Sequence, residues 1–231
     1  MTCAVVLPAM NEAANIAPLV AALSALGVAA IVVDNGSTDD TAAVARAAGA
    51  TVVSEPIAGY GRACKSGLEA ALEADFDVIA FMDADGSDPP HELVRLLEAL
   101  EGNDVVLGTR PRFSRGWRAM APAQKFGNWF APLLLRLSTG ARYADMPSFK
   151  VFSREALLRL APQDETYGFT IELLVRAHAL GLRVTEVPID YRPRAAGESK
   201  VSGDLRASAK AAVRILSVVG RYAWEAKRRR R

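Results

Sequence analysis

Short runs of aliphatic and β-branched residues alternate with helical hydrophobic patterns through the first half of the chain, and this alternation most constrains the fold. Residues 78–82 read Val-Ile-Ala-Phe-Met, without a polar side chain, as expected for a strand buried on both faces. The predicted strands are 3–7, 30–33, 51–54, 78–82 and 105–109, and the predicted helices are 15–26, 37–49, 62–74 and 90–100. Elements that alternate in this way form a mostly parallel central sheet flanked by helices. The predicted fold class is therefore α/β, with a Rossmann-like domain.

The second half of the chain is less regular. Residues 112–122 have no hydrophobic period and are rich in Arg and Pro, which predicts a mobile loop. Further elements are predicted as helices at 125–137 and 169–180 and as strands at 148–152 and 183–187. These elements complete one domain, predicted to span residues 1–203.

Charge is distributed unevenly along the chain. The formal net charge of +2 is too small to suggest a nucleic-acid partner. Residues 204–231 carry nine Lys and Arg, and their apolar residues recur at helical spacing, which predicts a basic amphipathic helix and tail. Such an end either meets an anionic surface, or packs its apolar stripe on the domain and leaves only the final basic run solvated.

Cysteine use and hydropathy indicate the compartment. Cys3 and Cys64 have no motif spacing and lie in apolar or helical patterns, so both are predicted to be buried thiols in a reducing environment. No uncharged apolar segment approaches the roughly 18 residues that a spanning helix needs. The sequence therefore predicts a cytoplasmic protein that does not cross a membrane and can bind one only peripherally.

Three polar clusters follow predicted strands at the point where each strand ends. They are Pro8-Ala9-Met10-Asn11-Glu12, Asp34-Asn35-Gly36-Ser37 and Asp83-Ala84-Asp85-Gly86. In open parallel sheets, ligands bind outside the carboxyl ends of the strands. We therefore expect the three clusters to meet at one edge of the sheet and to form a binding site.

Asp83 and Asp85 are the strongest candidates for chemistry. Two carboxylates two residues apart at a strand exit can reach one hard divalent cation if the chain turns there, and Gly86 permits that turn. Without a cation the two carboxylates would repel each other. The alternative is a structural turn with a capping Asp, which the coincidence of three clusters disfavours.

Other polar positions leave two interpretations open. Asp34 can accept from a nucleobase or a ribose hydroxyl, whereas Ser37 or Asp39 is better explained as the N-cap of the following helix. The stretch from Arg194 to Lys200 offers a guanidinium, a hydroxyl and an ammonium around a glycine, which suits a phosphate but also a solvated basic loop.

The clusters together resemble a known family. Val5-Val6-Leu7-Pro8-Ala9-Met10-Asn11-Glu12, Asp34-Asn35-Gly36-Ser37-Thr38-Asp39 and Met82-Asp83-Ala84-Asp85-Gly86-Ser87-Asp88-Pro89-Pro90 are similar to the motifs of family 2 glycosyltransferases with the GT-A fold. Supporting stretches are Val105-Val106-Leu107-Gly108-Thr109-Arg110, Asp145-Met146-Pro147-Ser148-Phe149-Lys150 and Glu186-Val187-Pro188-Ile189. The set, which spans residues 5–200, most resembles the dolichol/polyprenyl-phosphate mannosyltransferase branch.

The resemblance implies roles for individual residues. The implied contacts are Pro8, Glu12, Asp34, Asp83 and Ala84 for the nucleotide sugar, Asp83 and Asp85 for a Mg²⁺ or Mn²⁺ ion, and Arg194, Ser199 and Lys200 for phosphates. Asp85, Arg110 and Glu172 are the implied catalytic residues.

The implied reaction is inverting transfer of a hexose, mannose or glucose, from a nucleotide-sugar donor to a polyprenyl phosphate. A phosphate acceptor is already ionised near neutral pH and needs no general base. A soluble hydroxyl acceptor is the first alternative, and it would need a base, for which Glu172 is the candidate. Less favoured alternatives are a nucleotidyltransferase and a nucleotide-sugar-binding protein without turnover.

Overall fold

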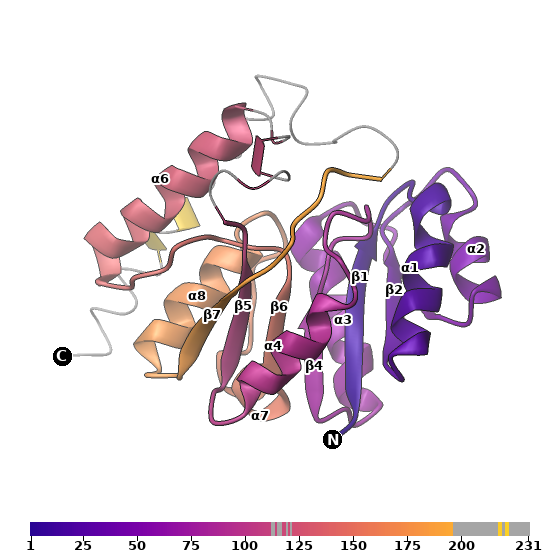
Figure 1. Ribbon diagram of the computed structural model, residues 1–231, viewed down its shortest axis with the longest axis horizontal. Helices are drawn as coiled ribbons and strands as arrows, with labels where there is room; N and C mark the ends of the chain where they lie inside the picture. The colour runs from indigo at the N-terminus through magenta and orange to yellow at the C-terminus, as the bar shows by residue number, and fades with distance from the viewer. Residues whose placement is uncertain are drawn as a thin grey trace.

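The computed structural model describes residues 1–111, 114, 117–118, 120, 122–195, 217–218 and 220–221, with the side chains of 122–124 left aside. A seven-stranded sheet forms its centre, in the order β3-β2-β1-β4-β6-β5-β7 (Figure 1). The strands are β1 (Cys3–Ala9), β2 (Ala29–Asp34), β3 (Thr51–Ser54), β4 (Val78–Phe81), β5 (Val105–Thr109), β6 (Lys150–Ser153) and β7 (Val184–Pro188).

One strand runs against the others. β6 pairs antiparallel with both β4 and β5, whereas all other neighbouring strands pair in parallel. The prediction of a mostly parallel sheet is therefore confirmed. Because β6 is reversed, the residues that precede it arrive at the same edge of the sheet as the residues that follow β4 and β5.

Helices cover both faces of the sheet, as the alternating pattern predicts. The described helices are α1 (Ala13–Ala25), α2 (Thr41–Ala47), α3 (Tyr60–Glu73), α4 (Glu92–Leu100), α6 (Pro122–Thr139), α7 (Arg154–Leu160) and α8 (Phe169–Ala179). Apolar side chains of α1, α2 and α4 form one core with one face of the sheet, and those of α3, α7 and α8 form a second core with the other face. Val5 and Val6 on β1 illustrate the alternation, because they are both fully buried but belong to different cores.

Most predicted elements lie within about two or three residues of the observed ones. Helix α7 is an exception, since no helix was predicted between residues 152 and 169. It begins where the Ser153 hydroxyl accepts a hydrogen bond from the Ala156 backbone N–H at 3.2 Å. The hydroxyl satisfies one of the free amides of the first turn and so fixes the start of the helix.

Several predictions fall largely outside the described residues. Of the predicted loop at 112–122, residues 117 and 118 are helical. Of the predicted helix and tail at 204–231, only four residues are described; all are helical, and Val218 is buried. Where the chain is described, none of its helices has both the length and the apolar character needed to span a bilayer.

Both thiols are buried, as predicted from their apolar surroundings. Cys3 lies on β1 and Cys64 on α3, and neither forms a disulfide. Burial raises the pKa of each thiol to about 12, so that both remain protonated at neutral pH.

Candidate active site

The three polar clusters meet at the carboxyl edge of the sheet, as predicted. β1 lies between β2 and β4, with Ala9 in register with Asp34 and Val6 in register with Phe81. The chain winds outward from β1 in opposite directions through β2 and β4, so this edge is a topological switch point. Ligands of open α/β sheets bind at such a point.

The loops after β1 and β2 are joined by hydrogen bonds. The Asn11 side-chain oxygen accepts from the Thr38 backbone N–H at 2.7 Å, and the Ser37 hydroxyl accepts from the Asn11 backbone N–H at 2.9 Å. Asp34 accepts from the Ser37 backbone N–H at 3.2 Å through one carboxylate oxygen. Neither Ser37 nor Asp39 occupies the N-cap position, because α2 begins at Thr41 after Asp40, and both side chains tie the two loops together. Asp39 nevertheless accepts from the Thr41 backbone N–H at 3.1 Å and so binds the first amide of the helix, as a capping side chain would.

A group of three carboxylates follows β4. Gly86 adopts a φ of 77°, which allows the chain to turn so that Asp83, Asp85 and Asp88 face the same region. Asp88 accepts from the Asp83 backbone N–H at 3.3 Å and from the Ser148 hydroxyl at 2.8 Å, and Asp85 accepts from the Ser87 backbone N–H at 2.9 Å. Ala84, between the two predicted ligands, is buried in the sheet's core.

The carboxylate group is electrostatically strained. Burial, followed by repulsion from Asp88 and Asp85, raises the pKa of Asp83 to about 7. Burial likewise raises the pKa of Asp88 to about 6, and one of its oxygens is buried without a hydrogen-bond partner. A divalent cation would relieve this strain, so the donor set fits a hard metal ion. Among the described residues no three acidic, His or Cys side chains form a complete metal site, so a cation here would also need oxygens from a bound diphosphate.

Lys150 lies behind the carboxylates and is fully buried on β6. Its ammonium donates to the carbonyl oxygens of Pro147 and Ser148, both at 3.0 Å, and to the Thr170 hydroxyl at 3.2 Å. Burial lowers the pKa of Lys150, while the nearby acidic groups, Asp83 and Asp88 among them, oppose that effect. The lysine therefore supplies internal positive charge without facing solvent.

Arg194 crosses from the far side of the sheet to the first and third clusters. Its guanidinium contacts the Glu12 carboxylate at 2.8 Å and the Asp85 carboxylate at 3.1 Å. The segment is held in place because Ala195 donates its backbone N–H to the Asp85 carbonyl oxygen at 3.0 Å. Figure 1 shows this segment leaving β7 and running back across the ends of the strands. Ser199 and Lys200 lie outside the described residues.

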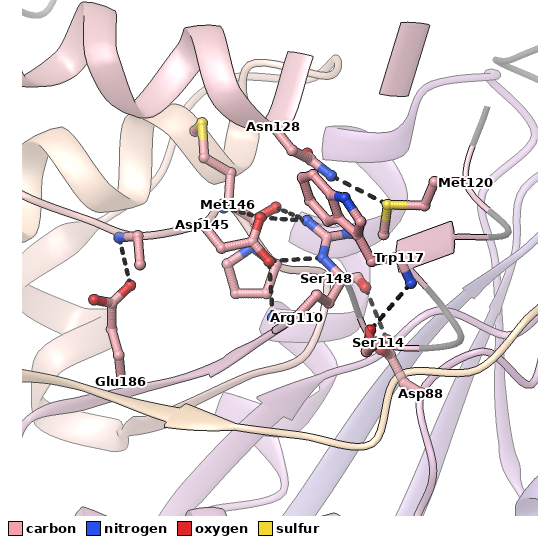
Figure 2. A network of polar contacts seen from close by, with 12 residues as sticks. Asp88, Arg110, Ser114, Trp117, Met120, Asn128, Asp145, Met146, Ser148 and Glu186 are labelled. Atoms are coloured by element: carbon pink, nitrogen blue, oxygen red, sulfur yellow. Dashed lines mark hydrogen bonds and ion pairs between the residues drawn. The ribbon is translucent and has the colours of Figure 1, made fainter. Parts of the chain in front are cut away.

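Arg110 follows β5 and is engaged by its own neighbours (Figure 2). Its guanidinium forms a bidentate ion pair with Asp145, at 2.7 and 2.8 Å, and donates to the Met146 carbonyl oxygen at 3.0 Å. It also lies 5.4 Å from the centre of the Tyr191 ring. A mostly apolar cavity of about 610 Å³ opens beside this ion pair and continues toward α6. The ion pair with Asp145 therefore holds the guanidinium of Arg110 in place within the lining of the cavity.

Glu172 lies away from the carboxylate group and is fully buried at the start of α8. One oxygen accepts from the backbone N–H groups of Gln163 and Asp164, at 2.8 and 2.6 Å, and the other pairs with Arg176 at 3.0 Å. A carboxylate enclosed in this way holds the preceding loop on the helix. This geometry gives it no free oxygen directed at an acceptor.

Sequence analysis assigned no role to Asp88, Asp145, Ser148 or Lys150. The signal for Asp88 was a third Asp within six residues, and that for Lys150 was a charged residue at the start of an apolar strand. Their proximity depends on the reversed direction of β6, which the local pattern does not contain.

Comparison with known proteins identifies the family of the chain. The model of the family described as glycosyl transferase family 2 matches residues 4–160. The chain is 43% identical over 206 residues to an uncharacterized glycosyltransferase of Mycobacterium tuberculosis, with 88% of this chain and 91% of the relative covered. It is 34% identical over 221 residues to the polyprenol monophosphomannose synthase of Mycolicibacterium smegmatis, with 86% and 80% covered.

A solved structure is also similar. It is glucosyl-3-phosphoglycerate synthase from M. tuberculosis in complex with Mn²⁺, uridine diphosphate and glucosyl-3-phosphoglycerate. The TM-score is 0.71 at 30% sequence identity, and the alignment covers 95% of this chain and 80% of the synthase.

Proposed function

The chain belongs to glycosyl transferase family 2, and from that premise we propose that it transfers a hexose from a nucleotide-sugar donor to a polyprenyl phosphate. The observation that carries the proposal is the carboxylate group after β4, with the guanidinium of Arg194 directed at it from the segment after β7. Acidic and basic groups that converge at a switch point suit a cation and a diphosphate together.

The donor is proposed to bind across the ends of β1, β2 and β4. Pro8, Glu12 and Asp34 surround the nucleoside, and Asp34 offers a carboxylate oxygen at a strand end to a base or ribose hydroxyl. Arg194 then exchanges its contacts with Glu12 and Asp85 for the donor's phosphate oxygens. The similar synthase was crystallised with uridine diphosphate and Mn²⁺, which supports a nucleotide at this edge.

A divalent cation is proposed to be held by Asp83 and Asp85. When bound, the cation offsets the negative charge that develops on the departing nucleoside diphosphate. Asp83 must be ionised to bind the cation, and Asp85 keeps one oxygen on the Ser87 backbone N–H, which orients its other oxygen. Lys150 contributes positive charge from behind and so limits the repulsion within the pair.

The acceptor is proposed to be a phosphate rather than a hydroxyl. Glu172, the candidate base for a hydroxyl acceptor, is enclosed by backbone amides and Arg176. A phosphate monoester is largely ionised at neutral pH and attacks the anomeric carbon without a base. The similarity to a polyprenol monophosphomannose synthase supports the same choice.

A soluble hydroxyl acceptor is the second candidate. It is favoured by the similarity to glucosyl-3-phosphoglycerate synthase, whose product is named in its crystal structure. The two candidates differ in where the labelled sugar goes. A polyprenyl product partitions into organic solvent, whereas a product made from phosphoglycerate stays in water.

The test uses the purified full chain with Mn²⁺ and labelled GDP-mannose, GDP-glucose, UDP-glucose or UDP-mannose. Each donor is offered with detergent-dispersed polyprenyl phosphate or with phosphoglycerate. Asp85→Ala is the inactive variant, and Asp77→Ala, before β4 at the opposite edge of the sheet, is its matched control. We expect label in the organic phase for wild type and control only. Label that appears in the aqueous product alone would overturn the choice of acceptor. Release of hexose 1-phosphate, with the nucleotide joined to the acceptor, would indicate a nucleotidyltransferase.

A lipid acceptor requires the enzyme to reach a membrane. We propose peripheral association at the cytoplasmic face, to which the basic segment at 204–231 contributes charge. A chain shortened to residue 203 should then bind anionic vesicles less tightly than the full chain, and equal binding would exclude this contribution.

A further inference from the structure

Helix α6 presents an apolar stripe to solvent. Phe126, Trp129, Leu133 and Leu137 are exposed by 58%, 47%, 37% and 76%. Their spacing places them on one side of the helix. Ala131 and Leu135, on the opposite side, are buried, and Leu135 belongs to the core under α8. The inner side of α6 therefore packs on the domain, while its outer side is largely exposed to solvent.

Aromatic rings concentrate at one end of the stripe. Phe126 stacks on Phe130 with ring centres 5.4 Å apart, and Trp129 lies 6.0 Å from Phe126 and 6.4 Å from Phe130. Trp is enriched where proteins meet the boundary between lipid and water, because its ring is apolar and its N–H is polar. A solvent-exposed cluster of this kind is costly in water and suits such a boundary.

The chain segment that contains the stripe carries charge of one sign. Residues 111–144 contain six Lys and Arg and no Asp or Glu. Lys125 and Arg136 lie on α6 itself, and Arg142 follows the helix. Neither Arg136 nor Arg142 forms an ion pair with another described residue. Two acidic residues, Asp145 and Glu186, lie near this face in the cavity lining; Asp145 pairs with Arg110, and Glu186 accepts from the Ala144 backbone N–H at 2.9 Å. An apolar face with an excess of cations at its border is complementary to an anionic bilayer.

The stripe also lies near the cavity beside Arg110. Trp129, Leu133 and Arg136 of α6 line that cavity, and so does Arg142. Figure 1 shows α6 at the end of the molecule away from α2, beside the half of the sheet that holds β5 and β7. A surface that met α6 would therefore meet the mouth of the cavity as well.

We propose that the outer face of α6 docks on the surface of an anionic lipid bilayer. Phe126, Trp129, Leu133 and Leu137 enter the boundary between headgroups and acyl chains, and Arg136 and Arg142 contact lipid phosphates. The docking rests on the proposed function, because a polyprenyl phosphate acceptor is what requires the enzyme to reach a membrane. It places the membrane contact on the domain itself, in addition to the basic segment at 204–231.

The first test compares two double variants of the full chain. Phe126→Ser/Leu137→Ser alters the stripe at two positions outside the cavity lining, and Val94→Ser/Leu158→Ser alters two exposed apolar residues on α4 and α7. Binding is measured by sedimentation with phosphatidylcholine vesicles, with and without phosphatidylglycerol. We expect binding only to the anionic vesicles, reduced at least tenfold by the stripe variant, unchanged in the control and weakened by salt. Equal binding of both variants, or no binding of the wild type, overturns the proposal.

The second test places a reporter on the helix. The chain has three Trp residues, so Trp117→Phe/Trp224→Phe leaves Trp129 as the single fluorophore. We expect its emission to shift to the blue on anionic vesicles and to be quenched by brominated lipid. If this protein binds vesicles without either change, α6 is not the docking surface. If light scattering instead shows a dimer that the stripe variant dissociates, the stripe is an interface between copies.

These outcomes are distinguishable from failure of the proposed function. Transfer to a short-chain polyprenyl phosphate in detergent needs no bilayer, so Phe126→Ser/Leu137→Ser, which leaves the cavity lining intact, should retain it. Loss of vesicle binding with transfer retained shows docking through α6. If the protein binds vesicles but transfers no sugar, docking through α6 stands and the proposed polyprenyl phosphate acceptor is wrong.

Discussion

Replacing Asp83 by Asn should stabilise the metal-free protein while abolishing its activity. The pKa of this carboxyl is raised from an ordinary value near 3.8 to about 7, chiefly by burial and by repulsion from Asp88 and Asp85. At about 1.4 kcal/mol per pH unit, ionised Asp83 then costs the folded state at most about 4 kcal/mol above pH 7. Because Asp88 shares the repulsion, we expect Asp83→Asn to raise the free energy of unfolding by about 2–4 kcal/mol at pH 8.

The sign of the pH dependence follows from the raised pKa. Between pH 3.8 and about 7 the folded state binds more protons at Asp83 than the unfolded state does, so wild-type stability falls as the pH rises through this window. Asn does not titrate, so the gain in free energy of unfolding of Asp83→Asn over the wild type should be small near pH 5 and complete near pH 8.

Thermal unfolding in EDTA at a series of pH values measures this difference. A shift of about 2–4 °C per kcal/mol is expected for a chain of this size. The matched control is Asp77→Asn, whose carboxyl has a lowered pKa because the Thr2 backbone N–H and hydroxyl donate to it, and which should not gain stability. Adding Mn²⁺ and the donor should stabilise the wild type and the Asp77→Asn control but not Asp83→Asn. If Asp83→Asn is less stable than wild type at pH 8, or its advantage does not change with pH, the reasoning is refuted.

Three further predictions address the other candidate residues. Asp85→Ala should abolish transfer with little change in melting temperature, because a carboxylate at a strand exit adds little packing. Full activity of this variant in EDTA would contradict the metal role. Arg194→Ala combined with Lys200→Ala should raise KM for donor or acceptor and lower kcat, since charge-assisted hydrogen bonds contribute about 1.5–3 kcal/mol each; unchanged steady-state kinetics would mark a solvated loop. Glu172→Gln should lower the free energy of unfolding by about 1–3 kcal/mol, because its buried partners lose a charged acceptor, yet leave kcat unchanged below the melting temperature. A large loss of kcat without loss of stability would restore Glu172 as a base.

The first half of the fold could be predicted because its local signals agree. Strands such as β4 are uniformly apolar, and helices such as α1 end at a glycine, so period and stop signals point to the same boundaries. α7 was missed because its seven residues establish no helical period and because, unlike the equally short α2, it is not followed by a glycine. The direction of β6 was not predicted, because it depends on which strands it joins rather than on its own four residues.

The candidate site, too, could be predicted only where its signals are local in the sequence. Asp83 and Asp85 were identified because a strand exit and a glycine are visible in the sequence. The enclosure of Glu172 was not, because its partners Gln163 and Asp164 lie in a loop whose course depends on packing against α8. The ion pair of Arg110 with Asp145 joins positions 35 residues apart, and no local pattern contains it.

The reversed direction of β6 has a consequence for how such enzymes can diversify. The chain leaves the sheet after β5 and re-enters it at β6 on the same edge, so the excursion between Thr109 and Lys150 begins and ends beside the carboxylate group. An excursion anchored in this way can change length or content without altering strand order. This segment can therefore be exchanged as a unit. Grafting the corresponding segment from a relative should change the acceptor specificity of the enzyme while the donor half, β1 to β4, stays intact.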